Sequence, residues 1–441
     1  MTEIVVGEIL WDRILALAAA PVEAGAALFL SPDRATDRWL AHDLTEAAGS
    51  DCLCATATAF TYAPQFLSRV TRMARQGGYA LALFHSHPSG FPDFSDTDDD
   101  TEQRLMPFMR VRLPEQPTLS LLMCDGQLRA RRLGTQDLIP VRRVGAVVHR
   151  SSLHAPEPVA DGAFDRQVRA FGAEGQATLA AMKVAIVGLG GTGSLVAQQL
   201  AHLGVGQLSL IDQDTIDETS LNRVVGATAV SVGQPKVSVA RSMISAIRPA
   251  AAVRSLHASV RSEQALHLLV DADCIMVCTD SHVSRAFVND VAYQYLVPAI
   301  DMGVAIGTDA GRVVSITGRT QMLAPGLPCL WCTNAISANT IRQELQSDAE
   351  RAADRYFDGD GVRQPAVISL NSTAASLAVS MLLGAFTGIP IGPRFQSYDA
   401  LRGTVRAFAF KARSDCGICG AEGLTALGDR QPLALVEKAS P

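Results

Sequence analysis

A short glycine-rich turn constrains the fold of this 441-residue chain more than any other feature. Lys183–Val187 has the composition of a buried strand, a Gly-Leu-Gly-Gly-Thr-Gly turn follows at once, and residues 194–203 predict a helix. A G-x-G-x-x-G turn in this context is typical of nucleotide-binding α/β folds, because backbone N–H groups and the helix N-terminus receive phosphates there. The glycines expected to contact a nucleotide are Gly188, Gly190, Gly191 and Gly193.

The residues after this turn decide between two kinds of nucleotide-binding protein. Residues 208–212 predict a second strand ending at Asp212, whose carboxylate could hold a ribose hydroxyl, and this much favours a nicotinamide oxidoreductase. Arg223 and Lys236 follow at a spacing that resembles the ThiF/MoeB-type adenylating enzymes, which activate ubiquitin-like proteins. The resemblance covers nearly all of residues 164–420 and implies that Asp212, Arg223 and Lys236 bind ATP.

The same resemblance implies roles for two further residues. Asp280, at the end of a strand-like run, matches the family's aspartate near the triphosphate and magnesium. Arg166 matches the arginine that family members extend across a dimer interface to a neighbour's ATP, so a homodimer is expected. Adenylation places a carboxylate against the α-phosphate and expels pyrophosphate, so positioned cations and a metal stabilise its transition state.

Asn222 departs from the family pattern. The family usually has Asn-Leu-x-Arg, whereas this chain has Ser-Leu-Asn-Arg over residues 220–223. Either Asn222 contacts the nucleotide from a shifted position, or Ser220 suffices in its place.

A second candidate site lies nearer the N-terminus. His85 and His87 close an apolar run, residues 79–84, that predicts a buried strand, so both imidazoles project from one face of it. Asp98 can add an oxygen ligand. Two nitrogens and one carboxylate leave the fourth zinc position open to water, as in a catalytic site, where the metal lowers the pKa of that water toward about 7. The competing interpretation is a histidine pair satisfied within the core.

This spacing, His-x-His and then Ser-x-x-Asp, resembles the JAMM motif of JAB/MPN metallopeptidases, which cut the bond after ubiquitin-like proteins. The resemblance implies that Glu23, following a helix near residues 11–20, is the general acid/base and that Ser95 hydrogen-bonds the tetrahedral oxyanion. Glu46 is the alternative base, in a stretch that favours helix or loop. The acidic residues expected to be merely solvated at a helix start are Asp96, Asp99 and Asp100.

Two CxxC pairs far apart in the chain predict a closed metal site. Four thiolates bind zinc tetrahedrally with no open position, which is a structural site, and the long gap fits the activating-enzyme family. No cysteine lies between the pairs, where thioester-forming members carry one. We therefore expect an acyl-adenylate without an enzyme thioester, and transfer of the acyl group to a sulfur donor or a conjugating enzyme. The proposed zinc ligands are Cys329, Cys332, Cys416 and Cys419.

Composition excludes several classes of protein. A net charge of -6 gives no indication of a nucleic-acid partner, and no apolar run long enough for a membrane span is expected. The cysteine pattern indicates a reducing cytoplasm. We expect an α/β protein with a JAB/MPN-type metallopeptidase domain over residues 1–150, a linker over 151–163, a Rossmann-like doubly wound adenylating domain over 164–425 and a C-terminal tail over 426–441.

The combined prediction is a bifunctional enzyme acting on a ubiquitin-like protein that ends in glycine. The first domain would cleave at the C-terminus of that protein with a zinc-activated water, and the second would adenylate the exposed carboxylate with ATP and magnesium. One alternative is an adenylating enzyme whose JAB domain is only a non-catalytic recruitment module. The other is a nicotinamide oxidoreductase, against which Arg223 and Lys236 argue.

Overall fold

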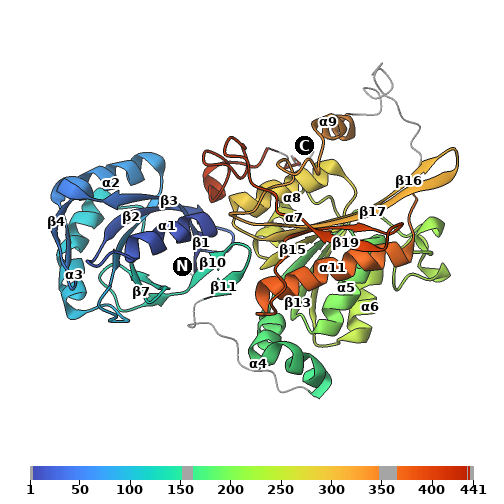
Figure 1. Ribbon diagram of the computed structural model, residues 1–441, viewed down its shortest axis with the longest axis horizontal. Helices are drawn as coiled ribbons and strands as arrows, with labels where there is room; N and C mark the ends of the chain where they lie inside the picture. The colour runs from blue at the N-terminus through green and yellow to red at the C-terminus, as the bar shows by residue number, and fades with distance from the viewer. Residues whose placement is uncertain (1–2, 151–161, 347–364, 435, 438–441) are drawn as a thin grey trace. The chain divides into compact units, whose positions relative to one another are not determined.

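The computed structural model of the chain describes residues 3–150, 162–346, 365–434 and 436–437, and these form two compact units (Figure 1). Unit 1 contains the N-terminal part of the chain together with Gln294–Leu296 and Leu424–Pro432, and unit 2 contains most of the remainder. The linker predicted over residues 151–163 lies almost entirely outside the described residues.

Unit 1 is built on a mixed sheet that has nine strands within the described residues, ordered β11-β10-β1-β3-β2-β6-β7-β8-β9. A separate hairpin pairs β4 with β5. The strands are β1 (Glu3–Gly7), β2 (Gly25–Asp33), β3 (Arg38–Ala47), β4 (Cys52–Ala55), β5 (Phe60–Tyr62), β6 (Ala80–Ser86), β7 (Thr118–Cys124), β8 (Gln127–Arg132), β9 (Leu138–Ile139), β10 (Val141–Val144) and β11 (Val148–Arg150). The helices are α1 (Glu8–Ala18), α2 (Pro64–Gly77) and α3 (Asp96–Arg112).

The unit 1 sheet has a core on each face. On one face, Trp11 and Ile14 of α1 pack against alternate residues of the strands, such as Leu28 and Phe84. On the other face, α2 and α3 cover the residues between these, including Leu83. Helices on both faces explain why β6 is apolar along most of its length. His85 therefore lies near the end of a buried strand, and His87 directly follows that strand.

Unit 2 is a sheet of eight strands within the described residues, ordered β14-β13-β12-β15-β16-β17-β18-β19. The first five pair in parallel and the last three are antiparallel. The strands are β12 (Lys183–Val187), β13 (Gln207–Ile211), β14 (Ala252–Leu256), β15 (Cys274–Val277), β16 (Ala299–Asp309), β17 (Arg312–Leu323), β18 (Phe395–Asp399) and β19 (Thr404–Ala407). The helices are α4 (Asp165–Ala181), α5 (Gly191–Leu203), α6 (Lys236–Ile247), α7 (Glu263–Val270), α8 (His282–Gln294), α9 (Ala338–Leu345) and α11 (Ile368–Phe386).

The predicted α/β class, with a Rossmann-like second unit, is confirmed. Among the described residues, α11 has the length and hydropathy of a membrane-spanning helix, yet half of its most apolar window is buried in the protein. It packs against α5 and β16, as a core helix does. One local prediction is wrong: Glu46 lies on β3, paired with β2, rather than in a helix or loop.

Part of the segment predicted as a C-terminal tail lies within unit 1. The N–H of Arg34 donates to Asp429 Oδ2 at 2.8 Å, and the guanidinium of Arg430 stacks over the Tyr79 ring at 3.6 Å. Arg430 also donates to the carbonyl of Gly77. No sequence pattern predicted this placement, because each of these contacts joins residues far apart in the chain.

Candidate functional sites

The glycine turn of unit 2 has the tight geometry that its sequence predicts. Gly188 has φ +84°, which favours glycine, and its N–H donates to the carbonyl of Ile211 on the neighbouring strand. A Cβ on Gly193 would lie 1.8 Å from the carbonyl oxygen of Gly188, so only glycine lets α5 begin so close to β12. A Cβ on Gly190, in contrast, would meet no atom within 4 Å. The start of α5 is therefore open at Gly190, where a phosphate could approach the backbone.

Asp212 lies at the end of β13 and braces this turn. Its Oδ2 accepts from the N–H of Leu189 at 2.6 Å, and its Oδ1 accepts from the N–H of Asp214 at 2.8 Å. Burial raises the pKa of Asp212, although Lys236 and the two N–H donors oppose the shift. Each carboxylate oxygen keeps a second acceptor site, so Asp212 can still receive a ribose hydroxyl.

Two of the predicted cations lie around the turn and the aspartate that braces it, Asp212. Arg223 packs against Gly191, since a Cβ added there would lie 3.3 Å from its Cδ. Lys236 begins α6, and its Nζ pairs with Asp214 Oδ2 at 2.7 Å. Asn371 of α11 also reaches Gly191 and is only 6% exposed. Sequence reasoning missed Asn371, because nothing in a long apolar helix marks one asparagine as part of a remote turn.

The other predicted nucleotide contacts are less closely gathered. Asp280 is exposed just after β15, and Arg166 is exposed near the start of α4. Among the described residues, Arg166 makes no hydrogen bond or ion pair with another predicted site residue. Asn222 is exposed and accepts from Arg223 at 3.3 Å, whereas Ser220 is buried and donates to Asp217 at 2.7 Å. Ser220 is thus already committed to its own turn, which leaves Asn222 as the available side chain.

A carboxylate from α9 lies beside Asp280. Glu344 accepts from the hydroxyl of Ser281 and from the N–H groups of His282 and Val283, so it occupies the N-terminus of α8. The N–H of Ser337, which caps α9, donates to His282 Nδ1 at 3.0 Å. In the cysteine-free segment between the two CxxC pairs, residues 347–364 lie outside the described part of the chain, and most of residues 340–346 are helix.

The four cysteines of the CxxC pairs meet in one cluster. The Sγ atoms of Cys329 and Cys332 are 3.8 Å apart, and the contacts of Cys329 with Cys416 and of Cys332 with Cys419 are each 3.5 Å. A tetrahedron of Zn–S bonds of roughly 2.3 Å has edges of about 3.8 Å, so these spacings fit zinc and are far too long for disulfides. Three of the four thiols are buried, as in a closed structural site.

The predicted metal ligands of unit 1 also converge. The ligand atoms of His85, His87 and Asp98 lie within 4.8 Å of one another, where the end of β6 meets the first turn of α3. Asp98 Oδ1 is 3.1 Å from His85 Nε2, and Asp98 Oδ2 is 3.4 Å from His87 Nε2. His87 Nδ1 lies 3.0 Å from the carbonyl of Phe91, to which it can only donate, so His87 Nε2 keeps its lone pair for a metal.

The buried Nε2 of His85 lies 3.1 Å from Asp98 Oδ1 but makes no well-aligned hydrogen bond within the described part of the chain. This nitrogen, beside a second imidazole nitrogen and a carboxylate, fits zinc or a similar divalent metal. Burial would raise the pKa of Asp98, but the neighbouring His85 and His87 outweigh it and hold that pKa well below its usual range. Asp98 is therefore ionised, as a metal ligand must be.

Glu23 is positioned by two segments around this cluster. Its N–H donates to the carbonyl of Thr56, and the next residue, Ala24, is tied to β6 by N–H donation to Ser86 Oγ at 3.0 Å. Glu23 Oε1 is 3.9 Å from His87 Nε2, and the residue is 4% exposed. Burial raises the pKa of Glu23, although His85 and His87 partly oppose the shift. Glu23 lies in the loop before β2, two residues before that strand begins at Gly25.

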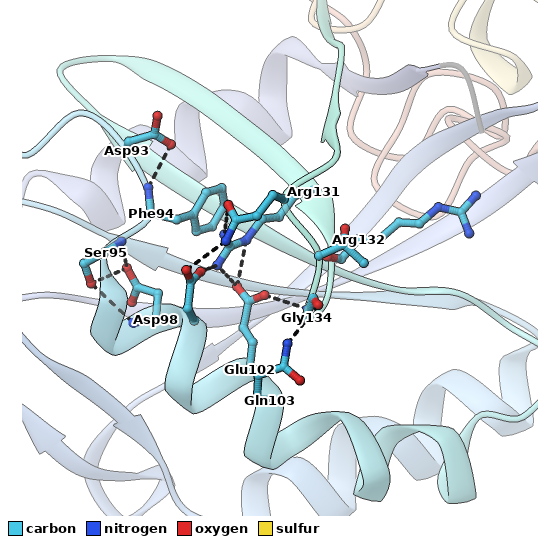
Figure 2. A network of polar contacts seen from close by, with 12 residues as sticks. Asp93, Phe94, Ser95, Asp98, Glu102, Gln103, Arg131, Arg132 and Gly134 are labelled. Atoms are coloured by element: carbon cyan, nitrogen blue, oxygen red, sulfur yellow. Dashed lines mark hydrogen bonds and ion pairs between the residues drawn. The ribbon is translucent and has the colours of Figure 1, made fainter.

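Ser95 is the N-cap of α3. Its hydroxyl donates to Asp98 Oδ2 at 2.7 Å, and the N–H groups of Ser95 and Asp98 complete a capping box with the two side chains (Figure 2). The hydroxyl that was predicted to stabilise an oxyanion is thus engaged with the carboxylate of a predicted metal ligand. It also sets the orientation of that carboxylate.

A small cavity adjoins the metal ligands. It has a volume of about 40 Å³ and is lined by His85, Asp98, Phe60 and Leu83 together with threonines from α3 and from the loop before β5. This space connects the candidate metal site with the end of the β4–β5 hairpin. It gives water or part of a substrate room beside the ligands.

Comparison with known proteins identifies relatives of both parts of the chain. The sequence model of the ThiF family matches residues 164–418, and that of prokaryotic homologs of the JAB domain matches residues 8–125. Molybdopterin-synthase adenylyltransferase of Salmonella typhimurium is 30% identical over 259 residues, which cover 58% of this chain and 95% of that protein. Sulfur carrier protein adenylyltransferase of Thermus thermophilus is 31% identical over 57% of this chain and 87% of its own length. SAMP-activating enzyme E1 of Haloferax volcanii is 25% identical over 58% of this chain and 87% of its own length.

Proposed function

The chain belongs to the ThiF family and carries an N-terminal JAB domain, and from this premise we propose that it is a bifunctional enzyme of ubiquitin-like proteins. Unit 2 adenylates the C-terminal carboxylate of a small protein that ends in glycine, using ATP. Unit 1 cleaves at the C-terminus of the same protein and so exposes that carboxylate.

The observation that carries the adenylation proposal is the arrangement around Gly191. Arg223 and Asn371 converge on the open start of α5, and Lys236 pairs with Asp214, whose N–H donates to the bracing Asp212. Cations stabilise the charge that develops on phosphoryl oxygens during adenylation, whereas hydride transfer by a dehydrogenase develops no such charge. Relatives named as adenylyltransferases support the same chemistry.

Three further assignments complete this half of the proposal. Asp280, an exposed carboxylate at the carboxyl end of β15, holds magnesium, which would neutralise the triphosphate. Arg166, exposed near the start of α4, acts on the ATP of a second copy of the chain in a homodimer. Asn222 contacts the nucleotide, and the acyl group then passes to a sulfur donor or a conjugating enzyme.

The observation that carries the cleavage proposal is the convergence of His85, His87 and Asp98, whose ligand atoms lie within 4.8 Å of one another. Zinc held by these three residues would supply an activated water at its open position. Glu23, buried with a raised pKa, can take a proton near that position and return it to the leaving group. Ser95 holds Asp98 in place and, once its hydroxyl is released, can donate to the oxyanion.

ATP–pyrophosphate exchange with small proteins ending in Gly-Gly tests the adenylation half. Lys236→Ala should lower exchange by about 100-fold or more, because it removes a cation aimed at developing charge. Lys183→Ala is the matched control. Lys183 lies at the start of β12 and pairs with Asp271, so its replacement should leave exchange unchanged. Equal exchange by the Lys236→Ala and wild-type proteins would contradict the assignment, and tight NAD binding without ATP binding would favour an oxidoreductase.

Zinc content tests the cleavage half. The proposed enzyme carries one zinc ion on the four cysteines and a second on His85, His87 and Asp98. Two zinc ions in the wild-type chain and one in His85→Ala are expected. One ion in both proteins would instead support a JAB domain that serves only as a recruitment module.

A further inference from the structure

The arginine at position 131 occupies a place in unit 1 where an apolar residue would be expected. Along β8, Leu128 and Ala130 belong to the core under α1, while Leu133 belongs to the core under α3. Arg131 points to the α3 side, since alternate residues of a strand share a face, and it is 1% exposed. A fully buried guanidinium is costly unless several partners satisfy it, so its partners indicate its purpose.

These partners lie on the first two turns of α3. Arg131 Nη2 is 2.7 Å from Asp99 Oδ1 and 2.9 Å from Glu102 Oε1, and Nε donates to the same Glu102 oxygen at 3.2 Å (Figure 2). The other oxygen of Glu102 accepts from the N–H of Gly134 at 2.7 Å. Asp99 was predicted to be solvated, and the structure corrects this. The guanidinium of Arg131 therefore holds α3 at two points, at Asp99, which follows Asp98 directly, and at Glu102, one helical turn after Asp98.

Arg131 also contacts the surroundings of His85, through the ring of Phe94. Its guanidinium lies over the ring of Phe94, with Cζ 3.8 Å from the ring centroid (Figure 2). The same ring meets His85 edge to face, with centroids 6.1 Å apart. Phe94 immediately precedes Ser95, the cap of α3. Arg131 thus contacts one neighbour of each of two metal ligands without touching either ligand.

From this geometry we propose that Arg131 is a positioning residue of the candidate metal site, one that holds the first turn of α3 and the Phe94 ring so that Asp98 and His85 keep ligand geometry. The inference rests on the proposed metal site of unit 1. A lysine would keep the charge but could not make the planar fork to two carboxylates or stack on the ring in the same way. Partners in the outer shell of metal sites typically change metal affinity by about 10- to 100-fold when they are removed.

The test is zinc affinity of the full-length chain, measured by competition with a chromophoric chelator, with unfolding followed in parallel. Arg131→Lys should weaken binding of the zinc ion that is lost in His85→Ala by about 10-fold or more. It should also lower the kcat of cleavage with little change in KM. Arg142→Lys is the matched control, since Arg142 is another buried arginine of the sheet, paired bidentately with Glu3. Its zinc affinity should stay within about twofold of wild type.

Phe94→Leu covers the case in which Arg131→Lys does not fold. The ring is half-buried, and its loss removes the contact to His85 while leaving the ion pairs of Arg131 intact, so weaker zinc binding is again expected. Wild-type zinc affinity in Arg131→Lys, or an equal loss in Arg142→Lys, would overturn the positioning role. If His85→Ala loses no zinc relative to wild type, the metal site itself is wrong and the inference fails with it.

Discussion

Individual side chains of this protein owe their chemistry to burial as much as to motif. Among the residues that the structure describes, Glu23 pairs with no arginine or lysine, and burial is the largest influence on its pKa, which is raised. A glutamate with a raised pKa exchanges protons closer to neutral pH than an exposed one, as an acid/base residue requires. His87 shows the opposite balance: burial would lower its pKa, but Asp98, the Phe91 carbonyl and Glu23 together raise it.

Replacing the base should separate metal binding from catalysis. Glu23→Gln keeps the size and burial of the side chain but removes the proton acceptor, so cleavage should fall by about 100-fold or more. Zinc content and ATP–pyrophosphate exchange should not change. Mass spectrometry of an extended ubiquitin-like substrate measures the cleavage. A Glu23→Gln protein that cleaves at the wild-type rate would show that another residue, such as Glu46 on β3, is the base.

At the scale of secondary structure, the N-terminus of α3 both stabilises the helix and forms part of the candidate metal site of unit 1. The capping box between Ser95 and Asp98 begins the helix and also orients the carboxylate of Asp98, a candidate metal ligand. The N-terminus of α8 is likewise occupied, by three hydrogen bonds to Glu344. Helix starts therefore shape both candidate sites.

Ser95 can be tested for a role beyond capping. Ser95→Ala should destabilise unit 1 by about 1 kcal/mol through loss of the cap. If the hydroxyl also stabilises the oxyanion, cleavage should fall by about 100-fold. Ser95→Thr restores the cap and provides the control. A cleavage rate reduced less than about fivefold, with the expected loss of stability, would restrict Ser95 to capping.

The carboxyl group of Asp290, inside α8, predicts that the stability of unit 2 depends on pH. Burial raises the pKa of Asp290 from 3.8 to about 7, and it has no cationic partner within the described part of the chain. Because the folded state holds this proton more tightly than the unfolded state, stability is full below about pH 4 and falls as pH rises toward 7. Asp290→Asn should therefore stabilise the protein more at pH 7.5 than at pH 5, and the two stabilisations should differ by at most about 3 kcal/mol, since about two units separate pH 5 from the folded pKa. Urea unfolding of both proteins at the two pH values gives this difference, and a gap that does not widen with pH would refute it.

Over the whole molecule, the sequence was sufficient where chemistry is carried by local spacing. His85 and His87 share a strand face, and a helix cap places Asp98, so their convergence could be predicted from two short segments. The glycine turn was predictable for the same reason. The meeting of the two CxxC pairs followed from the chemistry of zinc together with a family resemblance, not from spacing.

What the sequence could not predict depends on contacts between distant elements. The pairing of Asp99 with Arg131 joins α3 to β8, and Asn371 reaches Gly191 from a helix that is mostly apolar in sequence. Ser220 could have taken the place of the asparagine that the family usually has there, but its hydroxyl donates to Asp217. Such pairings are set by tertiary packing, which local propensity and periodicity do not describe.

The central claim is that both units act on one ubiquitin-like protein, and a single assay tests it most directly. ATP–pyrophosphate exchange is measured with the same small protein in two forms, one ending in Gly-Gly and one carrying a C-terminal extension. Wild-type enzyme should support exchange with both forms, after a lag with the extended one. His85→Ala should support exchange with the Gly-Gly form alone. Exchange by His85→Ala with the extended form at the wild-type rate, or no exchange by wild type with either form, would contradict the account.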